Sequence, residues 1–524
     1  MNVNEIMLWA VFAAVVGCIV ESAPAAGHSQ SAAICGSPSV DVSPDRVKTS
    51  ISVDMKRIGT IRPRSVKEAG GGAWTIGCEC LDRDYADFSK YRDYLPPLGI
   101  RTIRLQGGWA KCEKEKGVYD FRWLDEIVDW ANAHGLNCQL QTSYGNPLYL
   151  TGNFMGAKSV IPHEGEYFEA WKRWVDAMSR HFAGRVTEWE MWNEPNNTPG
   201  NTPERIIRNS IATAEIIKRH IPDAQIAAIV LGHDDGFEPL VRVLGESGKA
   251  NLFKWATVHL YDLNPAAETG RIDKMNALLA KHAPGLVLRQ GESGAVSEMV
   301  KYFGYMNLPF TEISQAKLDM MRMLVDNSYG MNTAVFTISD LHYAGRDASS
   351  GDGYAVQNNT KGLLRTNAKH DIIAIKRAYY AVQNVVSVFD GSVVPVRKGG
   401  SFSNTDETVF FREWRMGSGR PLVAFWQYET RRVTACPDAL PEFEPVHVMP
   451  SDSFSTRPTV FDYSGSPMKE PVWVDLFSGR VFEIPAANVL VHSCGVTFVD
   501  IPVYDSPCLI AERSDLPVVM DGVR

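Results

Sequence analysis

The chain has 524 residues, of which 45% are hydrophobic and 22% are charged. This composition is typical of a globular protein and excludes a disordered or membrane-embedded chain, while the length predicts two or three domains. The formal net charge of −8, with a pI near 5.9, argues against a nucleic-acid-binding protein, because such a protein needs a concentrated basic surface.

The N-terminus predicts an export signal. An apolar run from Leu8 to Val20 precedes the small residues Ala23-Pro24-Ala25, as at a signal-peptide cleavage site. The run is short for a membrane span, so residues 1–25 are interpreted as a signal for secretion or the periplasm. Val15-Val16-Gly17-Cys18 also resembles a lipoprotein box, in which Cys18 would carry a lipid anchor at the cell surface. No Lys or Arg precedes the run, which leaves a buried or disordered segment as the alternative.

Eight cysteines remain when Cys18 is set aside. An even number in an exported protein permits disulfides without proving them. The closest approach to a metal motif is Cys78-Glu79-Cys80, but it lacks the second Cys or His pair that a zinc site needs. These two are therefore interpreted as structural cysteines, and neither a metal nor an organic cofactor is expected.

From about residue 70, short apolar runs alternate with longer stretches of helical periodicity, which is the pattern of parallel βα units. Eight strands are predicted, at 73–77, 101–105, 136–142, 186–192, 225–231, 255–259, 286–290 and 333–338. Eight such units favour a (β/α)8 TIM barrel over an open doubly wound sheet. No Gly-rich phosphate loop follows the first strand, which further weakens the second architecture.

Helices are predicted between these strands from apolar residues spaced three and four apart. Pro96-Pro97 is expected to stop the first helix. Thr202-Pro203 is expected to cap and begin the helix after the fourth strand. The clearest later helices are predicted at Ile313–Val325 and Ile372–Val386.

After Gly391 the pattern changes to short strand-like runs divided by Gly, Pro, Ser and Asp, at 408–411, 422–428, 472–476 and 481–484. This predicts a C-terminal antiparallel β-sandwich. The expected organisation is an extended segment at 26–67, a catalytic barrel at 68–390 and an accessory sandwich at 391–524. Within the first of these, Ile51–Val53 is a candidate for an additional sandwich strand.

The sharpest motif is residues 188–196, Glu-Trp-Glu-Met-Trp-Asn-Glu-Pro-Asn. It sets Glu194 at the predicted C-terminal end of the fourth strand, which in such a barrel is the active-site face. Aromatic neighbours would partly desolvate this carboxyl and raise its pKa, as suits an acid catalyst. The amide of Asn193 can both donate to and accept from a substrate hydroxyl. The alternative is an incidental loop glutamate beside a turn proline.

A second carboxylate, Glu292, lies in Arg289-Gln290-Gly291-Glu292-Ser293-Gly294 at the end of the seventh strand. Glycines on either side let other groups approach it. The ends of the fourth and seventh strands face each other across a barrel mouth. Two carboxylates that converge there can cleave a glycosidic bond through a covalent intermediate, with Glu292 ionised as the nucleophile. A turn is the alternative for this motif.

Polar side chains at other strand ends are candidates for supporting roles. Arg104, on the second strand, could hydrogen-bond Glu292 and lower its pKa; a purely structural salt bridge is the alternative. His259 and Tyr261 end the sixth strand and, two residues apart, point the same way. Tyr261 could donate a hydrogen bond to the nucleophile, although a buried core pair is a competing interpretation for both.

Further candidates are aromatic or acidic residues beside the expected site. Trp109 and Tyr144 follow the second and third strands and could be platforms for sugar rings, together with Trp192; ordinary loop packing is the alternative. Asp340 follows the eighth strand and could bind a substrate hydroxyl, or close an Asx turn.

These residues resemble the clan A glycoside hydrolases, which are barrel enzymes. The resemblance is carried by Trp-Asn-Glu-Pro-Asn at 192–196, His259-x-Tyr261 and Glu292. The most similar group is glycoside hydrolase family 39, the β-xylosidases and α-L-iduronidases, through the segments 168–196, 337–340, 362–364 and 378–381. The resemblance covers about residues 70–390. It implies Glu194 as acid/base, Asn193 on the sugar 2-hydroxyl and Glu292 as nucleophile, with supporting roles for Arg104, His259 and Tyr261.

Two positions depart from the pattern of family 39. Gly291-Glu292-Ser293 stands where that family has Thr-Glu-Trp-like residues, and Phe336 stands where a tryptophan is common. Because both positions line the sugar site, they bear on the identity of the substrate.

The predicted activity is retaining hydrolysis of β-type glycosidic bonds in an oligosaccharide or polysaccharide, by exo cleavage. The first alternative is an endo-β-glycanase on a plant or algal polysaccharide. An open groove lined by Trp109, Tyr144 and Trp192 would favour endo cleavage, and a pit closed by the loop 345–359 would favour exo cleavage. The alternative of another class is an inactive glycan-binding barrel, which would need neither catalytic carboxylate; a barrel of unrelated chemistry is a further one.

Overall fold

The computed structural model describes residues 38–150, 160–232, 234–299, 308–343, 358–428, 431–433 and 447–522. The expected signal at 1–25, with Cys18, lies outside these residues, as does most of the loop 345–359. Within the described ranges, no helix is both long and apolar enough to cross a membrane.

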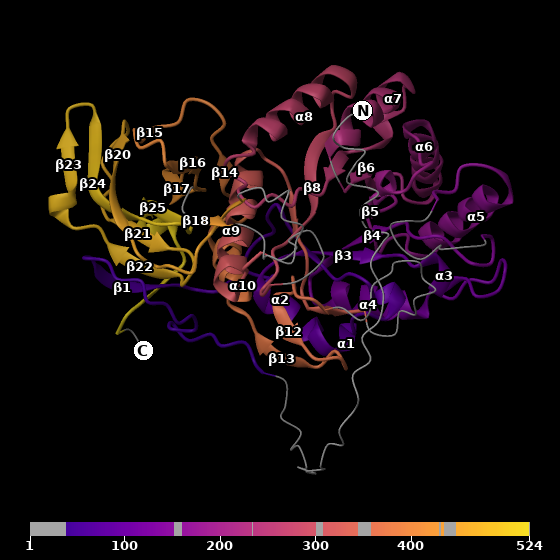
Figure 1. The fold of residues 1–524 in the computed structure, drawn as a ribbon, viewed down its shortest axis with the longest axis horizontal. Helices are drawn as coiled ribbons and strands as arrows, with labels where there is room; N and C mark the ends of the chain where they lie inside the picture. Colours follow the sequence, from indigo (N-terminus) through magenta and orange to yellow (C-terminus); the bar gives the residue numbers. More distant parts are fainter. Residues whose placement is uncertain are drawn as a thin grey trace, which may run out of the picture. The chain divides into compact units, whose positions relative to one another are not determined.

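Eight parallel strands close into a barrel (Figure 1). They are β2 (Trp74–Gly77), β3 (Thr102–Gln106), β4 (Asn137–Gln141), β5 (Glu188–Glu190), β6 (Gln225–Leu231), β7 (Trp255–Val258), β8 (Val287–Ser293) and β9 (Thr333–Val335). Closure comes from the parallel pairing of β2 with β9. The strands are almost wholly buried, as expected for a parallel sheet covered by helices. The barrel expected from the alternating sequence pattern is confirmed.

Helices surround the barrel. The long ones are α4 (Arg122–Ala133), α5 (Gly165–His181), α6 (Pro203–His220), α7 (Phe237–Glu246), α8 (Thr269–His282), α9 (Glu312–Ser328) and α10 (Arg377–Val388), and α1 (Phe88–Tyr91), α2 (Leu95–Leu98) and α3 (Trp109–Cys112) are single turns. The predicted cap is confirmed, because the Thr202 side chain accepts a hydrogen bond from the Arg205 amide at the start of α6. Thr311 forms a capping box with Ser314 at the start of α9.

Two helix predictions were wrong. Pro96-Pro97 does not stop a helix but forms the first turn of α2. In a first turn the backbone N–H groups have no partner within the helix, so the missing N–H of a proline costs nothing there. The turn ends instead at Gly99, which has a φ of +85°. Residues 372–375 are not helical: they form strand β13 (Ile372–Ile375), which pairs with β12 (Leu364–Thr366). The helix predicted there begins at Arg377.

The C-terminal region is an antiparallel β-sandwich, as predicted. One sheet has the order β14-β16-β17-β25-β21-β22-β1-β26 and the other the order β15-β20-β24-β23. The strands are β1 (Lys56–Ile61), β14 (Val394–Pro395), β15 (Phe402–Ser403), β16 (Val409–Arg415), β17 (Pro421–Gln427), β20 (Arg457–Tyr463), β21 (Pro471–Asp475), β22 (Arg480–Glu483), β23 (Val489–His492), β24 (Gly495–Val503), β25 (Cys508–Glu512) and β26 (Val518–Met520). The two sheets meet through aromatic rings such as Phe425 and Phe461, whose centroids are 4.7 Å apart.

The segment before the barrel does contribute a strand to the sandwich, but not at the expected position. Ile51–Val53 forms no strand, and β1 (Lys56–Ile61) lies a few residues later. It pairs with β22, beside which it lies in Figure 1, and on its other side with β26. Three small two-stranded pairs complete the described strands: β10 (Leu341–His342) with β11 (Asn358–Asn359), β12 with β13, and β18 (Arg431–Val433) with β19 (His447–Met449).

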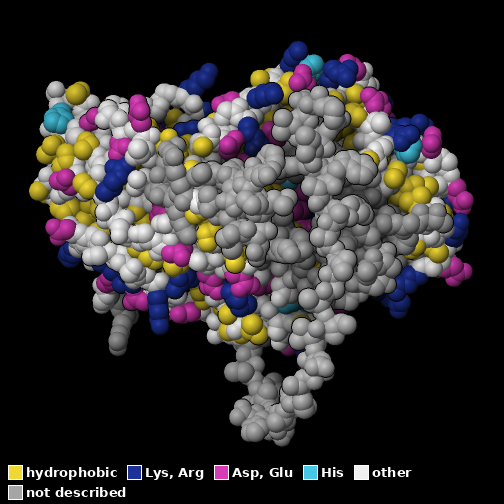
Figure 2. All heavy atoms as spheres, viewed as in Figure 1, with side chains coloured by type: hydrophobic (Ala, Val, Ile, Leu, Met, Phe, Trp, Pro, Cys, Tyr) yellow, Lys and Arg dark blue, Asp and Glu magenta, His cyan; other side chains and the backbone are white. Residues whose placement is uncertain are grey.

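The described surface carries both signs of charge. On the face drawn in Figure 2, acidic and basic side chains are interspersed over the described residues. Exposed apolar side chains occur on β23, where Leu490 and Val491 are 43% and 62% exposed. Six cysteines lie in the described ranges, and all six are unpaired; five are buried, and Cys494 is exposed.

Helix α9 joins the barrel to the sandwich. Its side chains are buried on every face, which places it in the interior and not on the surface. Lys317 on α9 forms a buried ion pair with Asp505 of the sandwich, with 2.7 Å between Nζ and Oδ1. Its ammonium also donates to the carbonyls of Ser451 and Ser453. On the same helix, Asn327 accepts a hydrogen bond of 2.7 Å from the indole of Trp414.

Loss of this buried pair should destabilise the fold. We expect Lys317→Ala to lower the free energy of unfolding by about 3–5 kcal/mol, because it leaves the Asp505 carboxylate buried without its counter-ion. The measurement is urea unfolding followed by tryptophan fluorescence. The control is Lys90→Ala, which breaks an ion pair with Asp371 whose side chains are 41% and 44% exposed, and which should leave the free energy of unfolding almost unchanged because solvent screens the pair. Equal losses in the two variants would contradict the role given to α9.

Candidate active site

The two glutamates singled out by sequence converge at the C-terminal ends of β5 and β8. Glu194 follows β5 with a φ of +47°, just before the turn that begins at Pro195. Glu292 lies on β8, and His259 follows β7. One carboxylate oxygen of each glutamate and one ring nitrogen of His259 all lie within 4.8 Å of one another. The side chains of Glu194 and Glu292 are 18% and 13% exposed, so both are mostly shielded from solvent.

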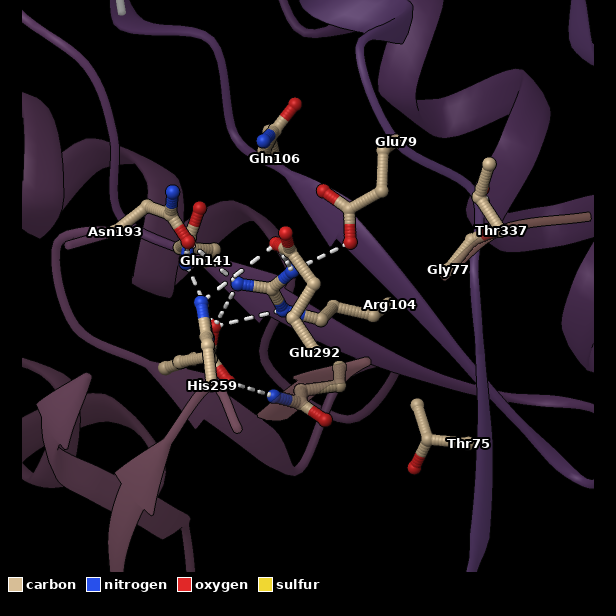
Figure 3. Close-up of polar contacts among 12 residues, drawn as sticks. Thr75, Gly77, Glu79, Arg104, Gln106, Gln141, Asn193, His259, Glu292 and Thr337 are labelled. Carbon is tan, nitrogen blue, oxygen red and sulfur yellow. Dashed lines mark hydrogen bonds and ion pairs between the residues drawn. The ribbon is translucent and has the colours of Figure 1, made fainter. Parts of the chain in front are cut away.

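Arg104, on β3, is the centre of the polar network under these groups (Figure 3). Its guanidinium is fully buried and forms ion pairs with Glu79, Glu190 and Glu292. A further N–H donates to the Asn193 side-chain oxygen at 2.8 Å. This leaves the amide nitrogen of Asn193 for another acceptor. The predicted contact of Arg104 with Glu292 is confirmed, and the guanidinium also fixes three further side chains.

Several groups act on the charge of Glu292. Arg104 Nη1 donates to Oε2 at 3.0 Å, and the Tyr261 hydroxyl donates to Oε1 at 2.7 Å, as predicted. Burial raises the pKa of this carboxyl, but the charges of His259 and Arg104 and the hydrogen bond from Tyr261 outweigh it. The net result is a pKa below the ordinary glutamate value, so Glu292 is held in its ionised form.

Glu194 has a different set of partners. His259 Nδ1 donates to Oε1 at 2.7 Å, and the Asn197 amide donates to Oε2 at 2.8 Å. Burial alone would lower the pKa of His259, but the charge of Glu292 and the hydrogen bond to Glu194 raise it above its ordinary value. His259 thus lies between the two carboxylates as a positive or hydrogen-bonding group and orients Glu194.

Glycines make this close arrangement fit. A Cβ at Gly291 would lie 2.1 Å from the Thr257 side chain and 3.0 Å from His259 Nε2. A Cβ at Gly232 would lie 2.9 Å from the carboxyl carbon of Glu194. Real side chains do not tolerate such distances. The expectation that glycines beside Glu292 permit close approach is therefore confirmed at Gly291.

Of the aromatic residues predicted to be sugar platforms, Trp109 does not have that role. Trp109 is fully buried, and its indole stacks with Tyr149, Tyr167 and Trp174. It begins helix α3 (Trp109–Cys112), and its ring points into the aromatic core and not into the site.

Trp192 and Tyr144 are also buried. The Trp192 ring packs at an angle against Trp171 and at right angles to Tyr144. The Arg83 guanidinium lies over the Tyr144 ring, 4.9 Å from its centroid. Both rings are therefore packed inside the protein, as the alternative prediction of ordinary packing expected.

Asp340 was predicted to meet a substrate hydroxyl or to close an Asx turn, but the structure shows its side chain buried and paired with Lys376. Its Oδ1 accepts hydrogen bonds from Lys376 Nζ at 2.6 Å and from the Gly362 amide at 3.0 Å. The side chains of Asp340 and Lys376 are 5% and 0% exposed. The pair anchors the segment after β9 to the start of α10, because a buried carboxylate requires a counter-charge.

Three polar residues of the site were missed by sequence reasoning. Asn197 lies two residues past the Glu194-Pro195 pair and bonds Glu194. Lys361 lies with its ammonium 4.4 Å from the Tyr261 ring centroid; burial lowers its pKa to about 8, against the opposing charges of Glu292 and Glu194. Glu79 follows β2 and pairs with Arg104. Only its position after the first strand could have indicated Glu79, because its motif reads as two structural cysteines.

The trio of Glu194, His259 and Glu292 also has the atom types that bind divalent metals. However, each carboxylate oxygen already accepts a hydrogen bond from a protein donor: His259 and Asn197 for Glu194, Tyr261 and Arg104 for Glu292. This donor set fits two carboxylates that act as acid, base or nucleophile.

Two sequence comparisons point to glycoside hydrolases. The model of a β-galactosidase family, glycoside hydrolase family 42, matches residues 89–154. A curated β-galactosidase, BgaA of Clostridium cellulovorans, is 25% identical over 157 residues. That match covers 25% of this chain and 24% of the relative, so it spans about a quarter of the length of either protein.

Solved structures resemble most of this chain in fold. A family 39 glycoside hydrolase from Bacteroides cellulosilyticus WH2 has a TM-score of 0.59 at 15% identity, over 86% of this chain and 83% of its own. The family 39 enzyme from Xanthomonas axonopodis pv. citri has a TM-score of 0.53 at 14% identity, over 86% and 95%. A family 30 endoxylanase from Clostridium papyrosolvens C71 has a TM-score of 0.51 at 12% identity, over 86% and 97%. The chain thus shares the fold of clan A glycoside hydrolases of families 39 and 30, and the resemblance seen in its sequence is confirmed.

Proposed function

We propose that the protein is a retaining glycoside hydrolase in which Glu194 is the acid/base and Glu292 the nucleophile. The observation that carries this proposal is the pair of carboxylates on opposite strand ends, with oxygens within 4.8 Å. A separation of about 5–5.5 Å is typical of retaining enzymes, while inverting enzymes need about 6.5–9.5 Å to admit a water molecule. The different partners of the two carboxylates support different roles.

In the proposed reaction, Glu194 protonates the oxygen of the departing group while Glu292 attacks the anomeric carbon. The ionised form of Glu292, maintained by Arg104 and Tyr261, is the form that can attack. Water then cleaves the glycosyl ester with Glu194 as the base. The free amide nitrogen of Asn193, whose oxygen is held by Arg104, is suited to bind the sugar 2-hydroxyl.

For the substrate we propose a β-type glycoside in an oligosaccharide or polysaccharide. Relatives named as β-galactosidases, a family 39 hydrolase and an endoxylanase support this class of bond. Exo cleavage is favoured over endo cleavage because the groove of Trp109, Tyr144 and Trp192 on which the endo alternative depended is not exposed. Secretion or export to the periplasm, directed by residues 1–25, remains part of the proposal.

The rival of another class is an inactive glycan-binding barrel. A binding protein does not need one carboxylate held ionised by a buried arginine and a second one beside a histidine. Such buried charges are unfavourable unless they serve a function or are fully compensated.

Replacing the nucleophile should abolish turnover. We expect Glu292→Ala to lower kcat at least about 1,000-fold, since the covalent route is lost. Sugar release is measured on a panel of β-linked oligosaccharides and polysaccharides, and the products are sized by mass spectrometry to separate exo from endo cleavage. The control is Glu246→Ala, an exposed glutamate at the end of α7, which should keep the wild-type rate. Wild-type rates in folded Glu292→Ala would show the mechanism to be wrong.

The acid/base role of Glu194 has its own signature. Glu194→Ala should be slow on natural glycosides and regain turnover of 4-nitrophenyl glycosides with azide, which can attack the glycosyl ester without a base. The product should be a glycosyl azide with the anomeric configuration of the substrate, as nuclear magnetic resonance can determine. A product of inverted configuration would contradict the assignment.

The acid limb of the pH profile should report Glu292. The nucleophile must be ionised, so kcat/KM is at its full value above the pKa of Glu292 and decreases as the pH falls through that pKa. Because the Tyr261 hydroxyl stabilises the charged form, Tyr261→Phe should raise the pKa of Glu292 and move the acid limb to higher pH. The control is Tyr504→Phe, whose hydroxyl donates to Asp475 within the sandwich. An unmoved acid limb in Tyr261→Phe would count against this role.

A further inference from the structure

Glu79 is a buried carboxylate at the mouth of the barrel to which the reaction above assigns no role. It lies two residues past β2 (Trp74–Gly77), between two unpaired, buried cysteines. Its side chain is only 1% exposed and pairs with Arg104. A structural role in the core explains the two buried cysteines, but it does not explain the acidic residue between them.

Glu79 and the nucleophile share a single nitrogen. Arg104 Nη1 donates both to Glu79 Oε1 and to Glu292 Oε2, which brings the two carboxylates side by side (Figure 3). A sugar that is attached to Glu292 therefore lies within reach of Glu79. Ring hydroxyls are the polar groups that such a sugar would present.

The second oxygen of Glu79 has no protein partner. Within the described part of the chain, Oε2 is buried and accepts no hydrogen bond, and Figure 3 shows it turned away from the Arg104 guanidinium. Glu190, the other buried carboxylate on Arg104, differs: Arg104 and Gln141 donate to its Oε1 and Gln139 to its Oε2. An unpaired buried oxygen is unfavourable in a folded protein, and Oε2 is available to accept a hydrogen bond from a ligand.

The backbone leaves space for this carboxylate. A Cβ at Gly77 would lie 3.1 Å from Glu79 Cγ and 3.2 Å from Oε1, closer than most side chains tolerate. The Gly77 carbonyl accepts a hydrogen bond of 2.6 Å from the Thr337 hydroxyl, which ties the end of β2 to the segment after β9 (Thr333–Val335). The absence of a side chain at Gly77 thus provides the space that the Glu79 carboxylate occupies.

We propose that Glu79 is a substrate-binding residue whose Oε2 forms a hydrogen bond with a hydroxyl of the glycone, the sugar that becomes attached to Glu292. The inference rests on the proposed function. Glu194, which follows β5, faces the departing group, whereas β2 lies on the other side of Glu292, next to β9. The contacted hydroxyl is therefore one of those remote from the bond that is cleaved.

This contact defines the substrate class more narrowly as a neutral sugar with a free hydroxyl at that position. A carboxylate or sulfate there would face an acidic side chain, and an acyl group would leave Oε2 unpaired. Burial raises the pKa of Glu79 to about 7 against the opposing charge of Arg104. A hydroxyl suits both protonation states, because it can donate to the ionised carboxyl and accept from the neutral one.

The test asks whether removing the Glu79 carboxylate and removing one sugar hydroxyl have the same effect, which shows that the two groups interact. kcat/KM is measured for wild type and Glu79→Ala on 4-nitrophenyl β-D-xyloside or β-D-galactoside and on the 2-, 3- and 4-deoxy analogues. In wild type, removal of the contacted 3- or 4-hydroxyl should cost about 10–100-fold. In Glu79→Ala the parent substrate should lose activity, and the same deoxy analogue should lose less than about 2-fold more. The 2-deoxy analogue should lose as much in both proteins, since Asn193 serves that hydroxyl.

Glu190→Gln is the matched control, because it perturbs the same guanidinium but both of its oxygens have protein partners. Its dependence on each hydroxyl should match wild type. Glu79→Leu, which fills the space without a hydrogen bond, repeats the test if Glu79→Ala does not fold. If every deoxy analogue loses as much in the Glu79 variants as in wild type, Glu79 only positions Arg104 and the inference is overturned, while wild-type hydrolysis still supports the proposed function. If wild type hydrolyses neither parent glycoside nor any sugar of the broader panel, both fail.

Discussion

The candidate site depends on one buried cation. The Arg104 guanidinium has no contact with solvent and binds three carboxylates and the Asn193 amide. Three acidic groups could not be buried so close together without it, because a buried charge that lacks a counter-charge is strongly unfavourable. The planar fork of an arginine can also serve several acceptors in fixed directions, which a lysine cannot do. The orientation of Glu292 and the free face of Asn193 both follow from this residue.

The two carboxylates proposed to carry out the reaction could be predicted from sequence, because they lie at the ends of predicted barrel strands. Glu194 follows the fourth barrel strand and Glu292 lies at the end of the seventh, an interval of three βα units, and a barrel brings such ends together. What the sequence does not contain is the direction of a side chain in a loop or a short turn. Trp109 was therefore expected to line the site, although it starts helix α3 and points into the core. Asp340 likewise lies near the site, but its carboxylate is bound by Lys376.

Most of the fold could also be predicted from the sequence. Every barrel strand was placed within a few residues, because short stretches with apolar residues alternate with longer stretches of helical periodicity. The errors lie where local signals conflict with tertiary pairing. Residues 372–375 continue the apolar pattern of helix α10, yet they form β13 because β12 offers a partner. β1 was expected slightly too early, because an extended segment has no periodicity to fix its register until its neighbours, β22 and β26, are known.

The position of β1 has a consequence for biosynthesis. Residues 59–61 pair with residues 518–520, so this sheet cannot close until the intervening chain and β26 have been synthesised. At roughly 5–20 residues per second, the ribosome needs on the order of half a minute or longer to make the intervening chain. During that time β1 is an unpaired strand edge that needs protection from aggregation.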